Sequence, residues 1–152
     1  MRLARLRLDH YRSYASAELE PDPGLTVIAG PNGAGKTNLL ESVWMAVSGR
    51  SHRTTSDAEL VAHGAPLARI SLDLAPVSGA QDRALVELVL PGAEPPVGLR
   101  RRLTVNGVAR RHTSLADTVR TVLFRPEEML LLVGPPSERR RCLPPFPPAP
   151  RR

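Results

Sequence analysis

A glycine-rich segment constrains this chain more than any other feature: Gly30-Pro31-Asn32-Gly33-Ala34-Gly35-Lys36-Thr37. It matches the pattern G-x-x-x-x-G-K-[ST], a P-loop, which is expected to follow a buried strand and to open a helix. Residues 25–29 form a short apolar run rich in β-formers, so we predict a buried strand there. Apolar residues at helical spacing over 38–47 predict the helix, closed by Ser48-Gly49.

Each part of this segment has a physical role in holding phosphate. Glycines let backbone N–H groups turn inward around a β-phosphate, and the helix N-terminus adds partial positive charge. Lys36 would contact the β- and γ-phosphates, and the Thr37 hydroxyl would coordinate Mg²⁺. ATP and Mg²⁺ are therefore the expected cofactors, bound by Gly30, Pro31, Asn32, Gly33, Ala34, Gly35, Lys36 and Thr37. The alternative is a chance glycine turn before a helix.

Composition narrows the remaining possibilities. Hydrophobic residues make up 41% and charged residues 24%, which is typical of a soluble protein with a core. No apolar run approaches the roughly 18 residues of a membrane span, and the N-terminus lacks the apolar block of a secretory signal, so we expect a cytoplasmic protein with no membrane contact. One cysteine excludes an internal disulfide, and the four histidines lack zinc-ligand spacing.

Alternating apolar and polar residues predict strands over 2–9 and 15–19 and two hairpins, 67–75 with 83–90 and 99–105 with 108–111. Asn106-Gly107 between the last two strands is the strongest short signal for a tight primed turn. Short helices are predicted from Ser56, Ser114 and Pro126, and a strand over 121–124. Trp44, on the apolar side of the P-loop helix, is interpreted as a core residue. The fold class is therefore α/β with a mixed sheet (α+β).

Hydrolysis of ATP would need an acidic residue at the end of a second apolar strand, and the sequence contains no apolar run ending in Asp-Glu. The segment 77–81 looks like the L-S-G-G-Q signature of ABC ATPases, but alternating strands flank it, which favours a hairpin turn. We therefore expect this chain alone to bind ATP without hydrolysing it.

The basic residues suggest a second binding surface. All but one of the 21 basic side chains are arginines, Lys36 being the only lysine, and they concentrate in the last third of the chain. The Asn-Gly hairpin would place Arg100, Arg102 and Arg111 on one face. That face either contacts DNA phosphates or is simply solvated.

Four segments make residues 1–141 resemble the N-terminal part of the RecF family, within the SMC-like ABC ATPases: 8–14 (LDHYRSY), 30–41, 49–54 (GRSHRT), and 123–128 with 136–141. The resemblance implies an incomplete N-terminal lobe of an ABC/SMC-type head, with Arg12 near the nucleotide. It also implies an ATP-dependent homodimer that binds gapped DNA, works with RecO and RecR, and acts in DNA replication, recombinational gap repair and the SOS response.

After Arg141 the sequence departs from that family. Residues 142–152 form a proline-rich tail, which we expect to be disordered; it could be a polyproline II ligand, or the result of a frameshift or truncated gene. The domain prediction is thus a P-loop lobe over 1–141 and a separate tail. Two other functions stay open, the ATPase subunit of a membrane transporter and a non-functional fragment.

Overall fold

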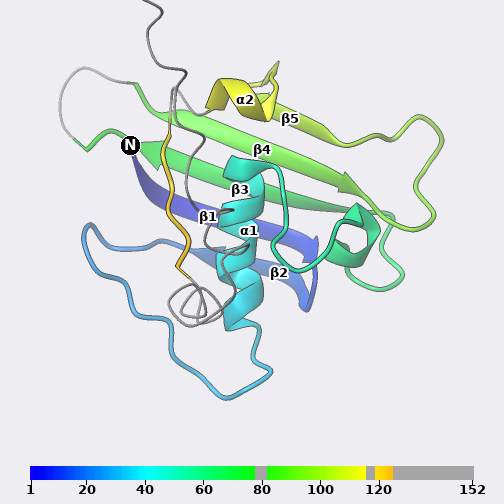
Figure 1. Ribbon diagram of the computed structural model, residues 1–152, viewed down its shortest axis with the longest axis horizontal. Coiled ribbons are helices and arrows are strands. Elements are labelled where there is room, and N and C mark those ends of the chain that lie inside the picture. The colour runs from blue at the N-terminus through cyan, green and yellow to red at the C-terminus, as the bar shows by residue number, and fades with distance from the viewer. Residues whose placement is uncertain (78–81, 116–118, 125–152) are drawn as a thin grey trace, which may run out of the picture. The chain divides into compact units, whose positions relative to one another are not determined.

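Six antiparallel strands form one sheet in the order β2-β1-β3-β4-β5-β6, and one long helix, α1, lies against it (Figure 1). The computed structural model describes residues 1–77, 82–115 and 119–124, and residues 1–121 form one compact unit. The elements are β1 (Arg2–Tyr11), β2 (Tyr14–Leu19), α1 (Lys36–Ser48), the 3₁₀ turn η1 (Asp57–Leu60), β3 (Leu67–Ala75), β4 (Ala84–Pro91), β5 (Arg102–Val105), β6 (Val108–Ala109) and α2 (His112–Leu115). The α/β fold class is confirmed.

The hairpins follow from strict alternation. β3 and β4 pair with Ile70 opposite Leu88 and Leu72 opposite Val86, and all four side chains are buried. The residues between them, such as Ser71 and Glu87, point to the other face and are only partly buried. The prediction of a hairpin around 77–81 is confirmed, so the signature-like segment connects antiparallel strands.

The Asn-Gly turn pairs Val105 with Val108 as predicted. Asn106 and Gly107 both have positive φ, +50° and +78°, as a type I′ turn requires. Asn106 also exchanges two hydrogen bonds of 2.8 Å with the backbone of Leu85, which ties the turn to β4. β6 ends at Ala109, two residues earlier than predicted, although the Arg110 N–H still donates to the Leu103 carbonyl oxygen at 3.0 Å.

Helix α1 packs only part of its predicted apolar stripe against the core, through Leu39, Val43 and Val47, and it buries other residues more deeply. Its buried residues are Glu41, Ser42, Met45 and Ala46. Leu40, on the predicted apolar stripe, is 51% exposed, and Trp44 is only partly buried and lies outside the core cluster. The prediction fails for Leu40 and Trp44, because Glu41 and Ser42 make hydrogen bonds inside the protein and polarity alone does not identify the outer face of this helix.

The C-terminal end of α1 is closed by residues from the β5–α2 region. Gly49 caps the helix at φ +76°, and the Arg101 guanidinium donates to its carbonyl oxygen at 2.6 Å and pairs with Asp57 at 3.2 Å. The His112 ring packs so closely that a Cβ at residue 49 would lie 2.6 Å from it. Burial, and then the nearby Arg101 charge, lower the pKa of His112.

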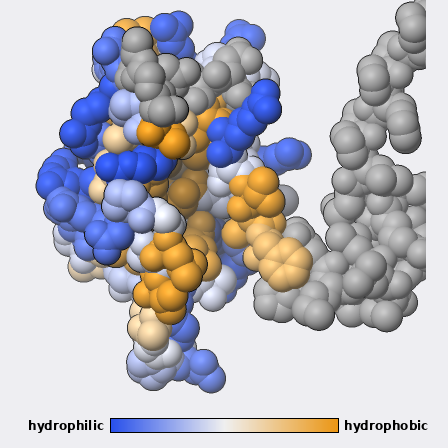
Figure 2. All heavy atoms as spheres, turned by 90° about the vertical axis from the view of Figure 1, so that its left-hand side faces the viewer, coloured by the Kyte–Doolittle hydropathy of each residue, from blue (hydrophilic) through white to orange (hydrophobic). Residues whose placement is uncertain are grey.

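The prediction of a buried strand over 25–29 is wrong. The segment pairs with no strand among the described residues, and Leu25 and Val27 are 87% and 77% exposed. Apolar atoms are open to solvent on this side of the molecule (Figure 2). A continuous apolar run becomes a strand when parallel neighbours cover it on both sides, and the observed sheet is wholly antiparallel.

The smaller predictions have mixed outcomes. Residues 121–124 form no strand, and Val122 and Phe124 are exposed. η1 begins after Ser56, whose side chain makes no capping hydrogen bond, and α2 begins at His112 instead of Ser114. The helix from Pro126, the boundary at 141 and the proline-rich tail lie outside the described residues. Within the described part of the chain, no helix has the length and apolarity needed to cross a bilayer.

We expect residues 25–29 to drive self-association, because an exposed apolar segment with extended backbone can pair with the same segment of another copy. The double variant Leu25→Ser, Val27→Thr should lower the fraction of dimer and larger species in sedimentation velocity. Its unfolding free energy should stay within about 0.5 kcal/mol of the parent, as is usual at exposed sites. Val97→Ser, at a site as exposed but elsewhere, is the control and should change neither quantity. Equal association by all three proteins would contradict the prediction.

Candidate nucleotide-binding site

The glycine-rich loop lies directly before α1, with Gly35 at the N-cap. Gly33 and Gly35 have φ of +84° and +92°, a region that favours glycine. A Cβ at Gly35 would lie 2.9 Å from both the Ser13 and the Tyr14 side-chain oxygens. The loop therefore packs against the β1–β2 turn, and only glycine fits at this contact.

Lys36 is the first residue of α1 and reaches back over the loop. Its Nζ donates to the carbonyl oxygens of Gly30 at 2.8 Å and Pro31 at 2.7 Å. Thr37 follows in the first turn of the helix, where N–H groups have no partner inside the helix. A phosphate group entering the loop would replace the two carbonyls as the partner of the ammonium. The residues present thus fit a nucleotide phosphate, and a cation on Thr37 would sit beside it.

Arg12 is held by a buried carboxylate. Its Nε and Nη2 donate to the Glu41 carboxylate at 3.1 and 3.0 Å, and its Nη1 donates to the Glu59 carbonyl at 3.0 Å. Glu41 is fully buried on α1. Arg12 has φ +52°, which is uncommon for a side-chain-bearing residue and is typical of functional sites. The structure thus places Arg12 beside the P-loop helix, and its contact with nucleotide stays a prediction.

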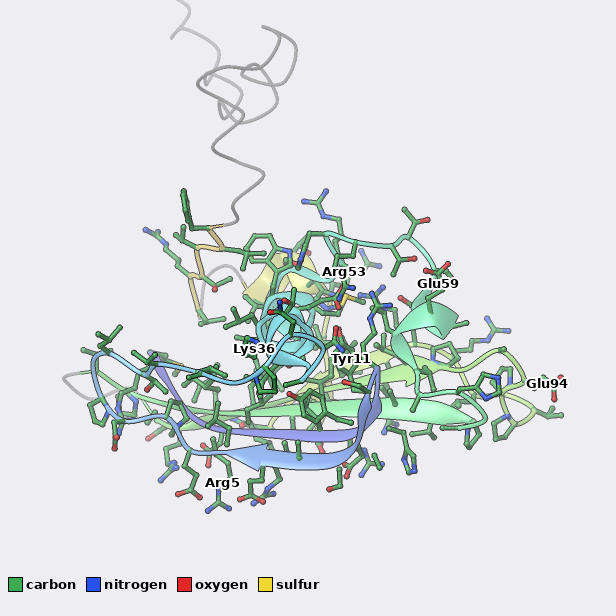
Figure 3. The ribbon with its side chains drawn as sticks, turned by 90° about the horizontal axis from the view of Figure 1, so that it is seen from below. Arg5, Tyr11, Lys36, Arg53, Glu59 and Glu94 are labelled. Carbon is green, nitrogen blue, oxygen red and sulfur yellow. The ribbon has the colours of Figure 1, made fainter. Side chains whose placement is uncertain are left out.

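Two further groups meet the same carboxylate. The Ser51 hydroxyl donates to Glu41, and Arg53 Nη1 lies 3.5 Å from it. Arg53 Nη1 also donates to Asn38 Oδ1 at 2.7 Å. Sequence reasoning missed Glu41, Ser51 and Arg53 as a group, although two segments of the family resemblance, 30–41 and 49–54, contain them. The side chains lie around α1, which Figure 3 shows nearly end on, with Lys36, Tyr11 and Arg53 labelled.

The charges in this cluster shift two ionisations. Burial works to raise the pKa of Glu41, but hydrogen bonds from Arg12 and Ser51 and the charges of Arg12 and Arg53 outweigh it and lower that pKa. Burial first, and then the Glu41 charge, raise the pKa of Tyr11, whose hydroxyl is buried without a hydrogen-bond partner among the described residues. At neutral pH Glu41 is therefore ionised and Tyr11 is neutral.

The common face predicted for three arginines of the Asn-Gly hairpin stays a prediction. Arg100, Arg102 and Arg111 are all exposed. Only Arg102 lies in a strand, opposite Val89 of β4. Their neighbour Arg101, which sequence reasoning did not single out, donates to the Gly49 carbonyl at the end of α1 and pairs with Asp57.

The fold and the site define a class of protein. A family profile described as "AAA domain" matches residues 5–105, and the chain belongs to that family. Within it, the sequence matches the N-terminal part of the DNA replication and repair protein RecF. It is 45% identical over 144 residues to the protein of Streptomyces avermitilis and 43% identical over 143 residues to that of Kineococcus radiotolerans. Each match covers 94% of this chain but only 36% and 35% of the relative, so the chain spans about a third of their length.

Comparison with solved structures gives the same family. One described as the recombination mediator protein RecF-ATPrS in the RecFOR pathway has a TM-score of 0.78 at 26% identity, over 92% of this chain and 36% of its own. Another, from work on ATP-driven dimerisation and DNA-stimulated activation of SMC ATPases, has a TM-score of 0.74 at 18% identity, over 91% of this chain and 95% of its own. The second likeness concerns the fold alone. The resemblance to RecF is thus confirmed.

We expect Arg12→Ala to destabilise the protein by about 3 kcal/mol at neutral pH, because it leaves a buried carboxylate with fewer partners. The pKa of Glu41 is lowered in the folded protein. Ionised Glu41 therefore stabilises the fold fully above its unfolded-state pKa of about 4.3, and this stabilisation is lost as the pH falls through its folded-state pKa. The difference between parent and variant should therefore shrink below about pH 4.

Urea unfolding from pH 7 to pH 3 measures this difference. Arg83→Ala is the matched control, because it breaks the more exposed Arg83–Asp73 ion pair and should cost no more than about 1 kcal/mol. A loss from Arg12→Ala as small as that of the control would mean that the buried pair does not stabilise the fold.

Proposed function

We propose that this chain binds ATP with Mg²⁺ through residues 30–37, as the nucleotide-binding lobe of a RecF-type DNA repair ATPase. The observation that carries the proposal is the loop geometry: Gly35 seated against Ser13 and Tyr14, with the Lys36 ammonium on the Gly30 and Pro31 carbonyls. A solved structure described as RecF-ATP, 26% identical over 92% of this chain, supports the choice of nucleotide.

In this proposal the chain's own residues supply phosphate binding and little else. Backbone N–H groups of the loop and the N-terminus of α1 face the phosphates, Lys36 neutralises their charge, and Thr37 is the ligand for Mg²⁺, which withdraws charge from the phosphate oxygens. The sequence has no apolar strand ending in Asp-Glu, so we propose that this chain by itself holds ATP without hydrolysing it.

The biological setting follows from the relatives. They are named as DNA replication and repair proteins, which supports a role in DNA repair, and we propose gap repair and the SOS response as the processes concerned. We propose DNA as a partner, with RecO, RecR and ATP-dependent dimerisation as further features of the family. A cytoplasmic location fits this setting.

Lys36→Ala should abolish ATP binding without unfolding the chain, because Lys36 is only partly buried and its ammonium hydrogen-bonds to carbonyl oxygens of its own loop. Titration with a fluorescent ATP analogue in Mg²⁺ gives the affinity, thermal melting gives the stability, and phosphate release tests turnover. Arg69→Ala, an exposed arginine on β3, is the control and should bind like the parent. Equal ATP affinity of Lys36→Ala and the parent would refute the P-loop assignment. Phosphate release by the parent that is lost in Lys36→Ala would refute the proposal that this chain does not hydrolyse ATP.

Binding of duplex DNA should be independent of sequence and should weaken steeply with salt if Arg100, Arg102 and Arg111 contact phosphates. Replacing all three with serine should lower the slope of log affinity against log salt by up to about three. Fluorescence anisotropy from 50 to 200 mM salt measures the slope. Because the three are exposed, folding should be unaffected. An unchanged slope would favour the solvated alternative.

A further inference from the structure

A cavity of about 520 Å³ lies between the η1 turn, the segment 61–66 that leads into β3, and residues 93–94 after β4. Its volume is in the range of protein ligand sites. None of residues 30–37, the proposed nucleotide site, lines it. Figure 3 shows Glu94, one of the lining residues, well away from Lys36. The cavity is therefore a feature of its own, separate from the P-loop.

Backbone contacts hold the walls of this cavity in place. The Ala62 N–H donates to the His10 carbonyl oxygen at 2.7 Å, which ties one wall to the end of β1. The Gly92 N–H donates to the Pro66 carbonyl oxygen at 2.9 Å, and a Cβ at Gly92 would lie only 2.5 Å from the Ala65 carbonyl oxygen. Only glycine lets two backbone segments approach so closely. The cavity is thus built into the fold, as is usual for ligand sites.

The lining combines an apolar floor with negative charge. Glu59 and Glu94 are both exposed, and within the described part of the chain neither carboxylate makes an ion pair. His63 is the other polar side chain of the lining. The apolar side chains are small and leave room for a larger one: Ala58, Val61, Ala62, Ala65, Pro66 and Ala93.

The charge of the cavity is opposite to that of the protein as a whole. The chain carries a net charge of +6, yet among the described residues no lysine or arginine lines this cavity. Two carboxylates without a cationic partner repel phosphate and attract a cation. The cavity is therefore unsuited to DNA or nucleotide, and its natural complement is a basic group attached to an apolar one.

We propose that this cavity binds a peptide segment of a partner protein in which a basic side chain adjoins an apolar one. The apolar side chain fills the floor, where it is removed from water. The guanidinium or ammonium group meets the carboxylates of Glu59 and Glu94, which come from different walls and suit a charge-assisted hydrogen bond. A free polyamine would engage the carboxylates but leave the apolar floor uncovered. This inference is independent of the ATP site.

The probe is the acetylated and amidated peptide Gly-Arg-Leu-Arg-Gly, titrated into the isotope-labelled protein while its backbone amide signals are followed by NMR. Shifts should concentrate at residues 58–66 and 92–94. Replacing both arginines of the peptide with glutamine should weaken binding about tenfold through the lost charged contacts. Replacing its leucine with glycine should weaken binding by about as much through the lost burial.

Protein variants test the two halves of the lining separately. Glu59→Gln with Glu94→Gln removes the charge and should weaken the peptide about tenfold. Ala93→Leu fills part of the cavity without changing its charge and should also weaken the peptide. Asp22→Asn with Asp82→Asn is the matched control, because it removes the same charge from exposed sites outside the cavity, and it should change the affinity less than about twofold. Every substituted residue is exposed, so thermal melting should be unchanged.

Several outcomes would overturn the proposal. Amide shifts outside the cavity, or equal binding by the parent and the double glutamine variant, would show that the peptide does not bind there. Spermidine binding as tightly as the peptide would show that charge alone is recognised. Self-association of the parent in sedimentation velocity that the double glutamine variant loses would make a second copy the occupant. Lys36→Ala should bind the peptide like the parent, so a failure of the ATP site leaves this test intact.

Discussion

One buried carboxylate holds the nucleotide end of this protein together. An ionised side chain without water is tolerated only where cationic and hydrogen-bonding groups surround it, and Glu41 has Arg12, Ser51 and Arg53 around it. These partners come from the β1–β2 turn and from the loop after α1. Satisfying one group therefore brings two segments to the helix that begins in the P-loop. It also explains why α1 presents a glutamate and a serine to the sheet while Leu40 is half exposed.

The sequence predicts the antiparallel part of the fold well, because its signals are local. Alternation over 67–75 and 83–90 specifies which face of each strand is buried, and Asn106-Gly107 specifies the register of its hairpin. The glycine-rich loop and its helix are predicted for the same reason. At that site Lys36 behaves as the motif indicates, reaching back over its own loop.

The errors arise where an element depends on residues far away in the sequence. A strand over 25–29 requires parallel neighbours, and no local pattern reports whether they are present. The contacts of Glu41 lie 29 residues before it and 10 and 12 residues after it, and a single charged residue within an apolar helix is ordinarily assigned to the surface. The arginine face of the Asn-Gly hairpin stays a prediction: β6 is two residues long, although the Arg110 N–H still donates to the Leu103 carbonyl oxygen.

The order of strands in the sheet affects how the chain is made. β1 lies between β2 and β3, and its residue Asp9 pairs with Ser16 on one side and with Arg69 on the other. The first partner leaves the ribosome almost at once, whereas the second follows only after residues 10–68. At a synthesis rate of about 5 to 20 residues per second, the side of β1 that pairs with β3 stays without a partner strand for several seconds. The P-loop and α1 are complete before β3 arrives, so the nascent chain carries its phosphate-binding segment before it has the sheet against which α1 packs.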